Sequence, residues 1–256
     1  GLFRNPLADP YLIGVASGAG LGAIGAVALE WPRSALGVLA IPLAAFAGAS
    51  LTVALVYGLG RVGRSAPTTT LILAGVAIGT LASALTTFIM ISLGSQAMRI
   101  LSFLLGGYGG AGWDAVIAVV PFALVGFAVM IASARPLNVL LFDEEQAKQL
   151  GIDVERVKLI LIAAATLCTA AAVSFSGLVG FVGLVVPHTA RLLWGPDHRR
   201  LLPLSALLGA GFLMLADLAA RVVLAPQELP LGIVTALVGV PFFLYLLRRA
   251  KHAAFF

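Results

Sequence analysis

The chain has 256 residues, of which 61% are hydrophobic and only 11% are charged, and its net charge is +5. Soluble domains carry about 25% charged residues, so the composition excludes a soluble fold and predicts an all-α polytopic membrane protein. The single cysteine, Cys168, lies in an apolar run. This excludes a disulfide framework within the chain and any multi-cysteine metal site.

Apolar segments of membrane-spanning length follow one another along the whole chain. We expect eight spans, at residues 11–30, 36–58, 69–93, 113–134, 157–175, 177–194, 202–224 and 231–249. An even number of spans places both termini on one side. Thirteen of the 16 Lys and Arg residues then share that side, and only Arg33, Arg99 and Arg221 lie on the other. The positive-inside rule predicts that both ends of the chain are cytoplasmic.

Small residues recur at helical spacing in the first and third of these spans. Gly14, Gly18 and Gly22 are four residues apart, as are Gly75 and Gly79. In lipid this spacing allows helix backbones to approach closely. The pattern therefore predicts tight helix packing here.

One long polar stretch, Phe142–Lys158, interrupts the apolar sequence and is called the polar element below. Asp143 can cap a first helical turn, and Gly151 suits the left-handed position after it. Asp153 can cap a second helix. These signals predict a compact cytoplasmic element on which another protein docks, although an ordinary solvated loop fits the composition equally well.

The sequence contains no nucleotide-binding motif G-x-x-x-x-G-K-[ST], so the chain is not expected to hydrolyse nucleotides itself. The three histidines, His188, His198 and His252, are too scattered for a metal cluster. We predict no catalytic residue, no cofactor and no metal site. Asp217 and Arg221 are four residues apart and can pair on one helix face. Charges at such a position are either functional or a structural ion pair.

Several motifs together resemble one family of transporters. Residues 180–191 read GFVGLVVPHTAR and resemble the signature G-F-[IV]-G-L-x-x-P-H-x-x-R of the FecCD family. These are permease subunits of type II ABC importers for iron–siderophore, haem and cobalamin. The resemblance extends over almost the whole chain, with further matches at Arg4–Pro10, Ala147–Gly151, Asp197–Arg199, Leu215–Asp217 and Glu228–Thr235.

The resemblance implies the type II ABC importer permease fold, as a single transmembrane domain over residues 1–256. Family members have ten spans, so eight of ten would be present and the N-terminal helices missing. The chain also starts at Gly1, without an initiator Met or a signal peptide, and is expected to be a fragment or a processed form.

The resemblance also implies partners and site residues. Two permease copies would pair around a central pathway in the membrane lipid. A cytoplasmic ABC ATPase would dock on the polar element at residues 142–158, with Glu144, Glu145, Ala147, Leu150 and Gly151 in the coupling role. Pro67, Thr68 and Thr69 would form part of the cytoplasmic gate. A periplasmic or lipoprotein substrate-binding protein would dock at Arg221, beside Asp217.

The expected function is ATP-driven import of a metal chelate across the cytoplasmic membrane of a bacterium or archaeon. Iron–siderophore is the first expectation. Cobalamin or haem is the alternative, because the glycine-rich Gly106–Gly110 with Trp113 looks somewhat like cobalamin permeases. A secondary transporter is a more distant alternative, which would call for mid-membrane ionisable residues and inverted repeats. No enzymatic activity and no nucleic-acid partner are expected.

Overall fold

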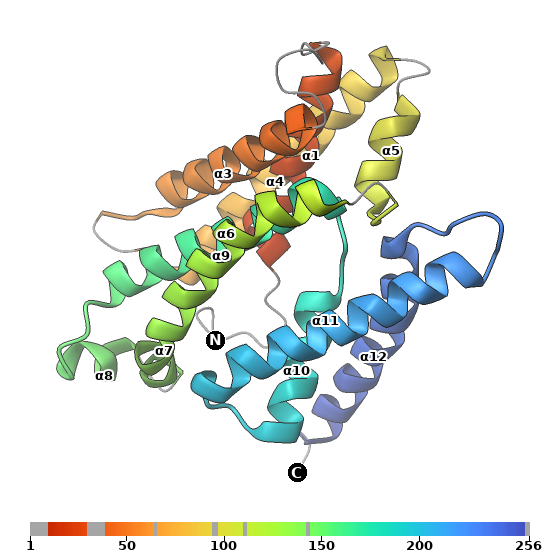
Figure 1. Ribbon diagram of the computed structural model, residues 1–256. Helices are drawn as coiled ribbons and strands as arrows, with labels where there is room; N and C mark the ends of the chain where they lie inside the picture. Colours follow the sequence, from red (N-terminus) through yellow and green to blue (C-terminus); the bar gives the residue numbers. More distant parts are fainter. Residues whose placement is uncertain are drawn as a thin grey trace.

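The computed structural model describes residues 10–29, 39–63, 66–93, 97–109, 112–141 and 144–253. These residues form helices joined by short connections (Figure 1). In chain order they are η1 (Pro10–Ile13), α1 (Val15–Ala28), α3 (Ala40–Gly60), α4 (Thr68–Ser92), α5 (Ala97–Leu105), α6 (Trp113–Ala132), α7 (Ala134–Leu140), α8 (Glu144–Gln149), α9 (Val154–Ser176), α10 (Val182–Trp194), α11 (His198–Val222) and α12 (Leu231–Ala253). The predicted all-α class is confirmed.

Each predicted span contains one helix, although not every helix is long enough to cross a bilayer. Helices α3, α4, α6, α9 and α11 are long and apolar enough to do so. Helix α10 has 13 residues and rises only about 20 Å, against a hydrocarbon core of about 30 Å. Helix α1 and the apolar part of α12 are also shorter. The chain is thus a multi-pass membrane protein, and the count of eight spans stays a prediction.

Helices α1 and α3 cross in close backbone contact. A Cβ atom on Gly18 would lie 2.6 Å from the carbonyl oxygen of Gly48, and one on Gly22 would lie 2.7 Å from the carbonyl carbon of Ala44. Real Cβ atoms do not approach this closely, so both positions require glycine. The predicted close packing is confirmed for these two residues. Gly14 instead precedes α1 with φ +82, where it caps the helix in the left-handed region.

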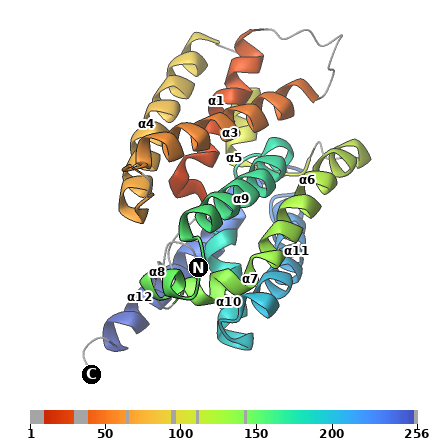
Figure 2. The same ribbon diagram turned by 90° about the vertical axis from the view of Figure 1, so that its left-hand side faces the viewer.

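Helix α9 lies in the centre of the molecule (Figure 2). Half of its most apolar stretch is buried, against 6% for α6. In this view α1, α3 and α4 lie on one side of α9, and α6 and α11 on the other. A large core joins α1, α3, the start of α4 and the side of α9, with Val15, Ala45, Val56, Ala66 and Ile162 among its buried residues.

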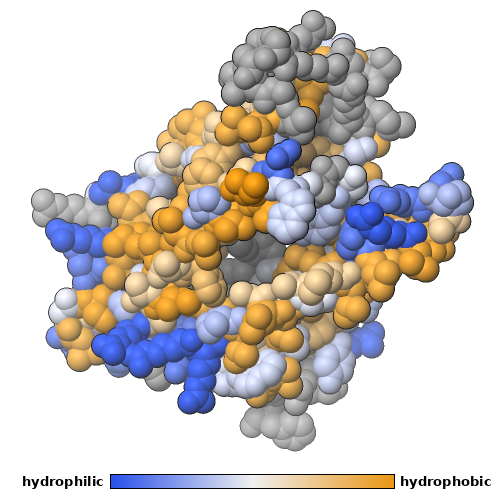
Figure 3. All heavy atoms as spheres, viewed as in Figure 1, coloured by the Kyte–Doolittle hydropathy of each residue, from blue (hydrophilic) through white to orange (hydrophobic). Residues whose placement is uncertain are grey.

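The outer surface of the helices is apolar between two polar ends (Figure 3). Hydrophilic side chains gather over α7, α8 and the start of α11, and again at the far end of α11. Such a band is what lipid requires of helices that cross a membrane. It places the polar element and Arg221 at opposite ends of the molecule.

Candidate functional site

The polar element is a packed unit and not a loose loop. Leu140 of α7, Ala147 of α8 and Val154 of α9 form a small core with Ile152 and Val157 packed against it. This small core holds α8 against the start of α9. The predicted compactness is thus observed, while docking of another protein on this element stays a prediction.

The turn between α8 and α9 has the predicted local chemistry. Gly151 adopts φ +80, and its N–H donates to the Lys148 carbonyl at 3.0 Å. Asp153 caps α9 by accepting a hydrogen bond from the Arg156 backbone N–H at 3.2 Å. Both predictions are confirmed. Asp143, the predicted cap of the first turn, lies outside the described residues.

The five predicted coupling residues separate into two kinds. Glu145, Leu150 and Gly151 are exposed, and Leu150 is an apolar side chain, 70% exposed, next to polar residues. Ala147 is fully buried in the small core, and Glu144 is half-buried. A partner that presses on this surface would therefore touch the first three, whereas Ala147 and Glu144 hold the surface in place.

Lys158 is a functional candidate that the sequence reasoning did not single out. Its side chain is only 4% exposed, and its amine lies 2.8 Å from Glu144 Oε2 and 3.7 Å from Glu155 Oε1. The amine also lies 3.5 Å from the carbonyl oxygen of Ala66, whose N–H donates to Glu155 Oε2 at 2.9 Å. One sequence feature could have pointed to Lys158: it follows Glu155 by three residues at the start of an apolar helix, a spacing that allows the two side chains to pair.

The predicted gate residues lie where α3 passes into α4, called the gate corner (the described residues among 60–70). Pro67 precedes α4 with φ −61 and ψ 138, the extended geometry of a helix cap. Thr69 is exposed and Thr68 is half-buried. The Thr70 hydroxyl donates to the Gly60 carbonyl at 2.6 Å and so fastens the start of α4 to the end of α3.

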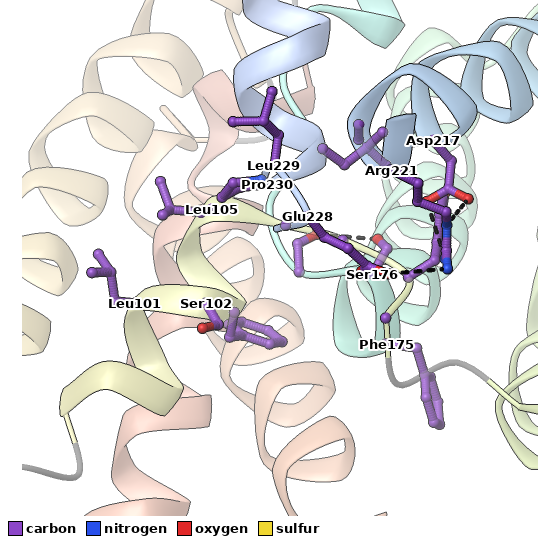
Figure 4. A pocket seen from close by; sticks show the side chains of 18 residues that line it. Leu101, Ser102, Leu105, Phe175, Ser176, Asp217, Arg221, Glu228, Leu229 and Pro230 are labelled. Atoms are coloured by element: carbon purple, nitrogen blue, oxygen red, sulfur yellow. Dashed lines mark hydrogen bonds and ion pairs between the residues drawn. The ribbon is translucent and has the colours of Figure 1, made fainter. Parts of the chain in front are cut away.

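At the other end of the molecule lies a cavity of about 590 Å³, called the Arg221 cavity. It is lined by residues of α5, the loop after it, the end of α9, α11 and the segment before α12, including Ser102, Tyr108, Phe175, Ser176, Asp217, Arg221, Glu228 and Pro230 (Figure 4). Its volume is within the range that holds small molecules. The predicted docking residue thus lines a real concavity.

Three chain segments meet backbone to backbone beside this cavity, at Gly106, Gly177 and Gly232, called the glycine corner. A Cβ on Gly106 would lie 2.5 Å from the Leu178 carbonyl oxygen, and one on Gly232 would lie 2.5 Å from that of Leu105. Hydrogen bonds from Gly107 to Ser176, Leu178 to Phe103 and Leu231 to Gly106 join the segments. The glycines are needed because only bare backbone fits.

Arg221 is held by two carboxylates (Figure 4). Its Nε donates to Asp217 Oδ2 at 2.8 Å and its Nη2 donates to Oδ1 at 3.4 Å, which confirms the predicted pairing geometry. Its Nη1 also donates to Glu228 Oε1 at 3.4 Å, a contact that local spacing could not reveal. The guanidinium side chain remains 42% exposed, so it can still meet a further group.

Tyr108 adds a phenol to the same cavity. Burial raises the pKa of Tyr108, and the nearby Asp217 carboxylate raises it further. The phenol is therefore neutral at physiological pH and keeps its proton for a hydrogen bond.

A second polar cluster joins α7 to the start of α11. The Asn138 amide donates to Asp197 Oδ1 at 2.6 Å, and Asn138 Oδ1 accepts from the His198 backbone N–H at 2.9 Å. The hydrogen bond from Asn138, followed by that from the Arg199 backbone N–H, lowers the pKa of Asp197. His198 is buried here. Within the described ranges no group of three or more His, Cys, Asp or Glu could hold a metal ion.

Comparison with known proteins identifies the family. Residues 1–249 match the sequence model of the FecCD transport family. The chain belongs to the FecCD transport family. It is similar to the cobalamin import system permease protein BtuC of Halobacterium salinarum, with 49% identity over 99% of this chain and 67% of the relative. It is also similar to the vitamin B12 import system permease protein BtuC of an Escherichia coli O9:H4 strain, with 41% identity over 98% of this chain and 76% of the relative.

A solved structure has the same fold as this FecCD permease. It is an inward-facing metal-chelate type ABC transporter with a TM-score of 0.87 and 30% identity, covering 96% of this chain and 79% of its own. The chain is therefore an ABC importer permease, a transport subunit without enzymatic activity of its own. The family implies a separate ATPase, a substrate-binding protein and a dimeric permease.

Proposed function

We propose that this permease carries cobalamin, as the membrane subunit of an ATP-driven importer. The observation that carries the proposal is the 49% identity to a permease named for cobalamin import, over 99% of this chain. The 41% identity to a vitamin B12 permease supports it. Iron–siderophore, the first expectation from the sequence, has weaker support, since the metal-chelate transporter is only 30% identical.

A groove along α1 and α4, lined by hydroxylated and small residues together with Tyr11, Val76, Leu104 and Leu178, is compatible with a passage that binds its cargo weakly. Its volume is about 530 Å³, and small or hydroxylated residues line it, including Ser17, Gly79, Thr80, Ser83 and Thr87. The hydroxyls of Thr80 and Thr87 donate to carbonyls of their own helix, at 2.7 and 3.0 Å. They therefore offer a cargo only weak acceptor sites. A passage that binds weakly releases its cargo readily.

Uptake of labelled cobalamin tests the proposal. The full-length permease, its ATPase and its binding protein would be expressed in cells that lack their own cobalamin permease. We expect saturable, ATP-dependent uptake that excess unlabelled cobalamin abolishes. A ferric hydroxamate and haem serve as competing cargoes. Uptake of either one without uptake of cobalamin would reject the assignment.

We further propose that the ATPase docks on the exposed side of the polar element and that Pro67, Thr68 and Thr69 belong to the cytoplasmic gate. The support is geometric: Glu145 and Leu150 offer an open surface on a packed unit. The orientation with this end in the cytoplasm rests on the distribution of Lys and Arg. A second permease copy would complete the pathway.

We also propose that a carboxylate of the binding protein docks on Arg221. Asp217 holds the guanidinium from its own helix, and Glu228 contacts it at the longer distance of 3.4 Å. The incoming carboxylate would take the place of Glu228, the weaker partner. Arg suits such recognition because its donors form a fixed fork.

Charge reversal separates docking from a purely structural role of Arg221. Under docking, Arg221→Glu weakens association with the binding protein in a salt-dependent way, and Glu228→Gln strengthens it by removing the competitor. An acidic-to-basic change on the partner should partly restore the reversed variant. The docking proposal would be refuted if Asp217→Arg alone restored the Arg221→Glu variant and the affinity for the binding protein stayed the same in all variants.

A further inference from the structure

We propose that Lys158 is a positioning residue that ties α8 to the gate corner, so that a movement imposed on α8 reaches the start of α4. The inference rests on the proposed function, because it takes α8 as part of the surface where the ATPase docks and the start of α4 as part of the gate. What it adds is the physical link between the two.

Three elements converge on the Lys158 ammonium group. Glu144 is the first residue of α8, Glu155 belongs to the first turn of α9, and Ala66 lies in the gate corner. Their oxygen atoms lie 2.8, 3.7 and 3.5 Å from Nζ. Lys158 and Ala66 are 92 residues apart in the sequence, so the tie connects segments that are distant along the chain.

Ala66 is held on both of its backbone polar groups. Its N–H donates to Glu155 at 2.9 Å, while its carbonyl oxygen faces Lys158. The next residue is Pro67, whose ring fixes φ. With Ala66 held and φ of Pro67 fixed, few soft dihedral angles remain before α4 begins. A displacement of the Lys158 cluster therefore changes the direction in which α4 starts.

The polar cluster lies between two separate apolar cores. Ala66 belongs to the large core, whereas Ala147 belongs to the small core of the polar element. Lys158 and the two carboxylates bridge the gap between them. Without the ammonium group, the carboxylates of Glu144 and Glu155 would face each other in a partly buried site with no cation between them. Lys158 thus adds a polar tie between α8 and the gate corner to the apolar packing that already holds α8 against α9.

Replacement of Lys158 tests the tie in the full-length permease reconstituted with its ATPase and binding protein. Lys158→Met keeps most of the length and the apolar stem but removes the charge. Complex assembly and basal ATP hydrolysis should persist. Cobalamin transported per ATP hydrolysed should fall by roughly two- to thirtyfold, the range found for residues along a coupling network. Loss of a residue that serves only folding would lower ATP hydrolysis and cobalamin transport together, and would leave their ratio unchanged.

Two further variants keep the test decisive. Glu144→Gln removes only the contact with α8 and leaves Lys158 paired with Glu155, so it serves if Lys158→Met fails to insert. The double variant Glu144→Gln/Lys158→Met should lose no more coupling than Lys158→Met alone, because both substitutions remove the same contact between α8 and Lys158. Arg156→Met is the matched control: it removes a cation from the same turn of α9, but its partner is Asp153 on that turn. It should stay close to wild type.

A distance measurement gives a readout independent of transport. Spin labels at Glu145 and Thr69, both exposed, report how α8 lies relative to the start of α4. Lys158→Met should broaden their distance distribution, and Arg156→Met should not. Wild-type coupling and distances in Lys158→Met, or equal losses in Arg156→Met, would overturn the tie. A wild-type complex that moves no cobalamin would reject the proposed cargo, while the distance measurement would still test the tie.

Discussion

Gly22→Ala should loosen the crossing of α1 and α3. The added Cβ would lie 2.7 Å from the carbonyl carbon of Ala44, and closer still to its oxygen. Carbon atoms pack best at about 3.5–4.0 Å, so the two helices must separate locally by about 0.8 Å or more. A gap of this size removes about a quarter to a half of the dispersion energy of each contact that it opens.

The same helix supplies a matched control. A Cβ on Gly25, three residues further along α1, would meet no atom within 4 Å. Gly25→Ala therefore has the same change in helix propensity without the collision. Overpacking of a close-packed interface typically costs about 1–3 kcal/mol. We expect Gly22→Ala to be less stable than Gly25→Ala by about this amount.

Unfolding of the purified full-length permease by titration with SDS measures this difference. The comparison of the two variants cancels effects of glycine on the unfolded chain. Equal unfolding midpoints for Gly22→Ala and Gly25→Ala would refute the reasoning. So would a stabilised Gly22→Ala, because it would mean that the backbones do not touch at this position.

Three other predictions concern the ends of the molecule. Gly151→Val should reduce ATPase docking or transport while membrane insertion stays normal, because a left-handed residue with a side chain costs about 1–2 kcal/mol; Gly151→Asn, which tolerates this conformation, is the control. Hydrogen bonding lowers the pKa of Asp197 below its ordinary value of 3.8. The Asp197 carboxylate therefore stabilises the folded state above pH 3.8, and this stabilisation is lost as the pH falls through the lower pKa of the folded state. Asn138→Leu should weaken this acid sensitivity, measured as SDS unfolding midpoints from about pH 5 down to values below 3.8. With Cys168 replaced, a cysteine at position 151 should react only from the cytoplasm and one at Arg99 only from outside, and outside labelling of position 151 in sealed cells would overturn the topology.

Local patterns in the sequence predicted most of the fold. Apolar length located a helix in every expected span, and the four-residue spacing of Gly18 and Gly22 predicted the tight crossing. The predicted spans 157–175 and 177–194 placed a break at residue 176 alone, whereas the non-helical segment covers residues 177–181. Phe181 has φ +65, and α10 begins only after it, which shortens that span. Helix α5 was also missed, because its nine residues were taken as part of an external loop.

The contacts of the candidate site fall into those that local sequence predicts and those that only the folded structure reveals. Asp217 and Arg221 are one helical turn apart, and the turn at Gly151 carries its own signals, so both could be predicted. Glu228 and the contact of Lys158 with Ala66 could not. These partners belong to different elements, and only the folded chain brings them together. Sequence patterns report neighbours along one helix, whereas contacts between elements depend on packing.

The glycine corner separates the frame of the Arg221 cavity from its contents. Gly106, Gly177 and Gly232 let three segments meet through close backbone contacts and hydrogen bonds, in which Tyr108 and Phe175 take no part. Residues such as Tyr108 and Phe175, which line the Arg221 cavity, can therefore change in size or polarity while the backbone frame of the cavity keeps its shape. Exchange of a few lining residues can therefore alter the surface that a docking partner meets, without disturbing the backbone contacts that frame the cavity.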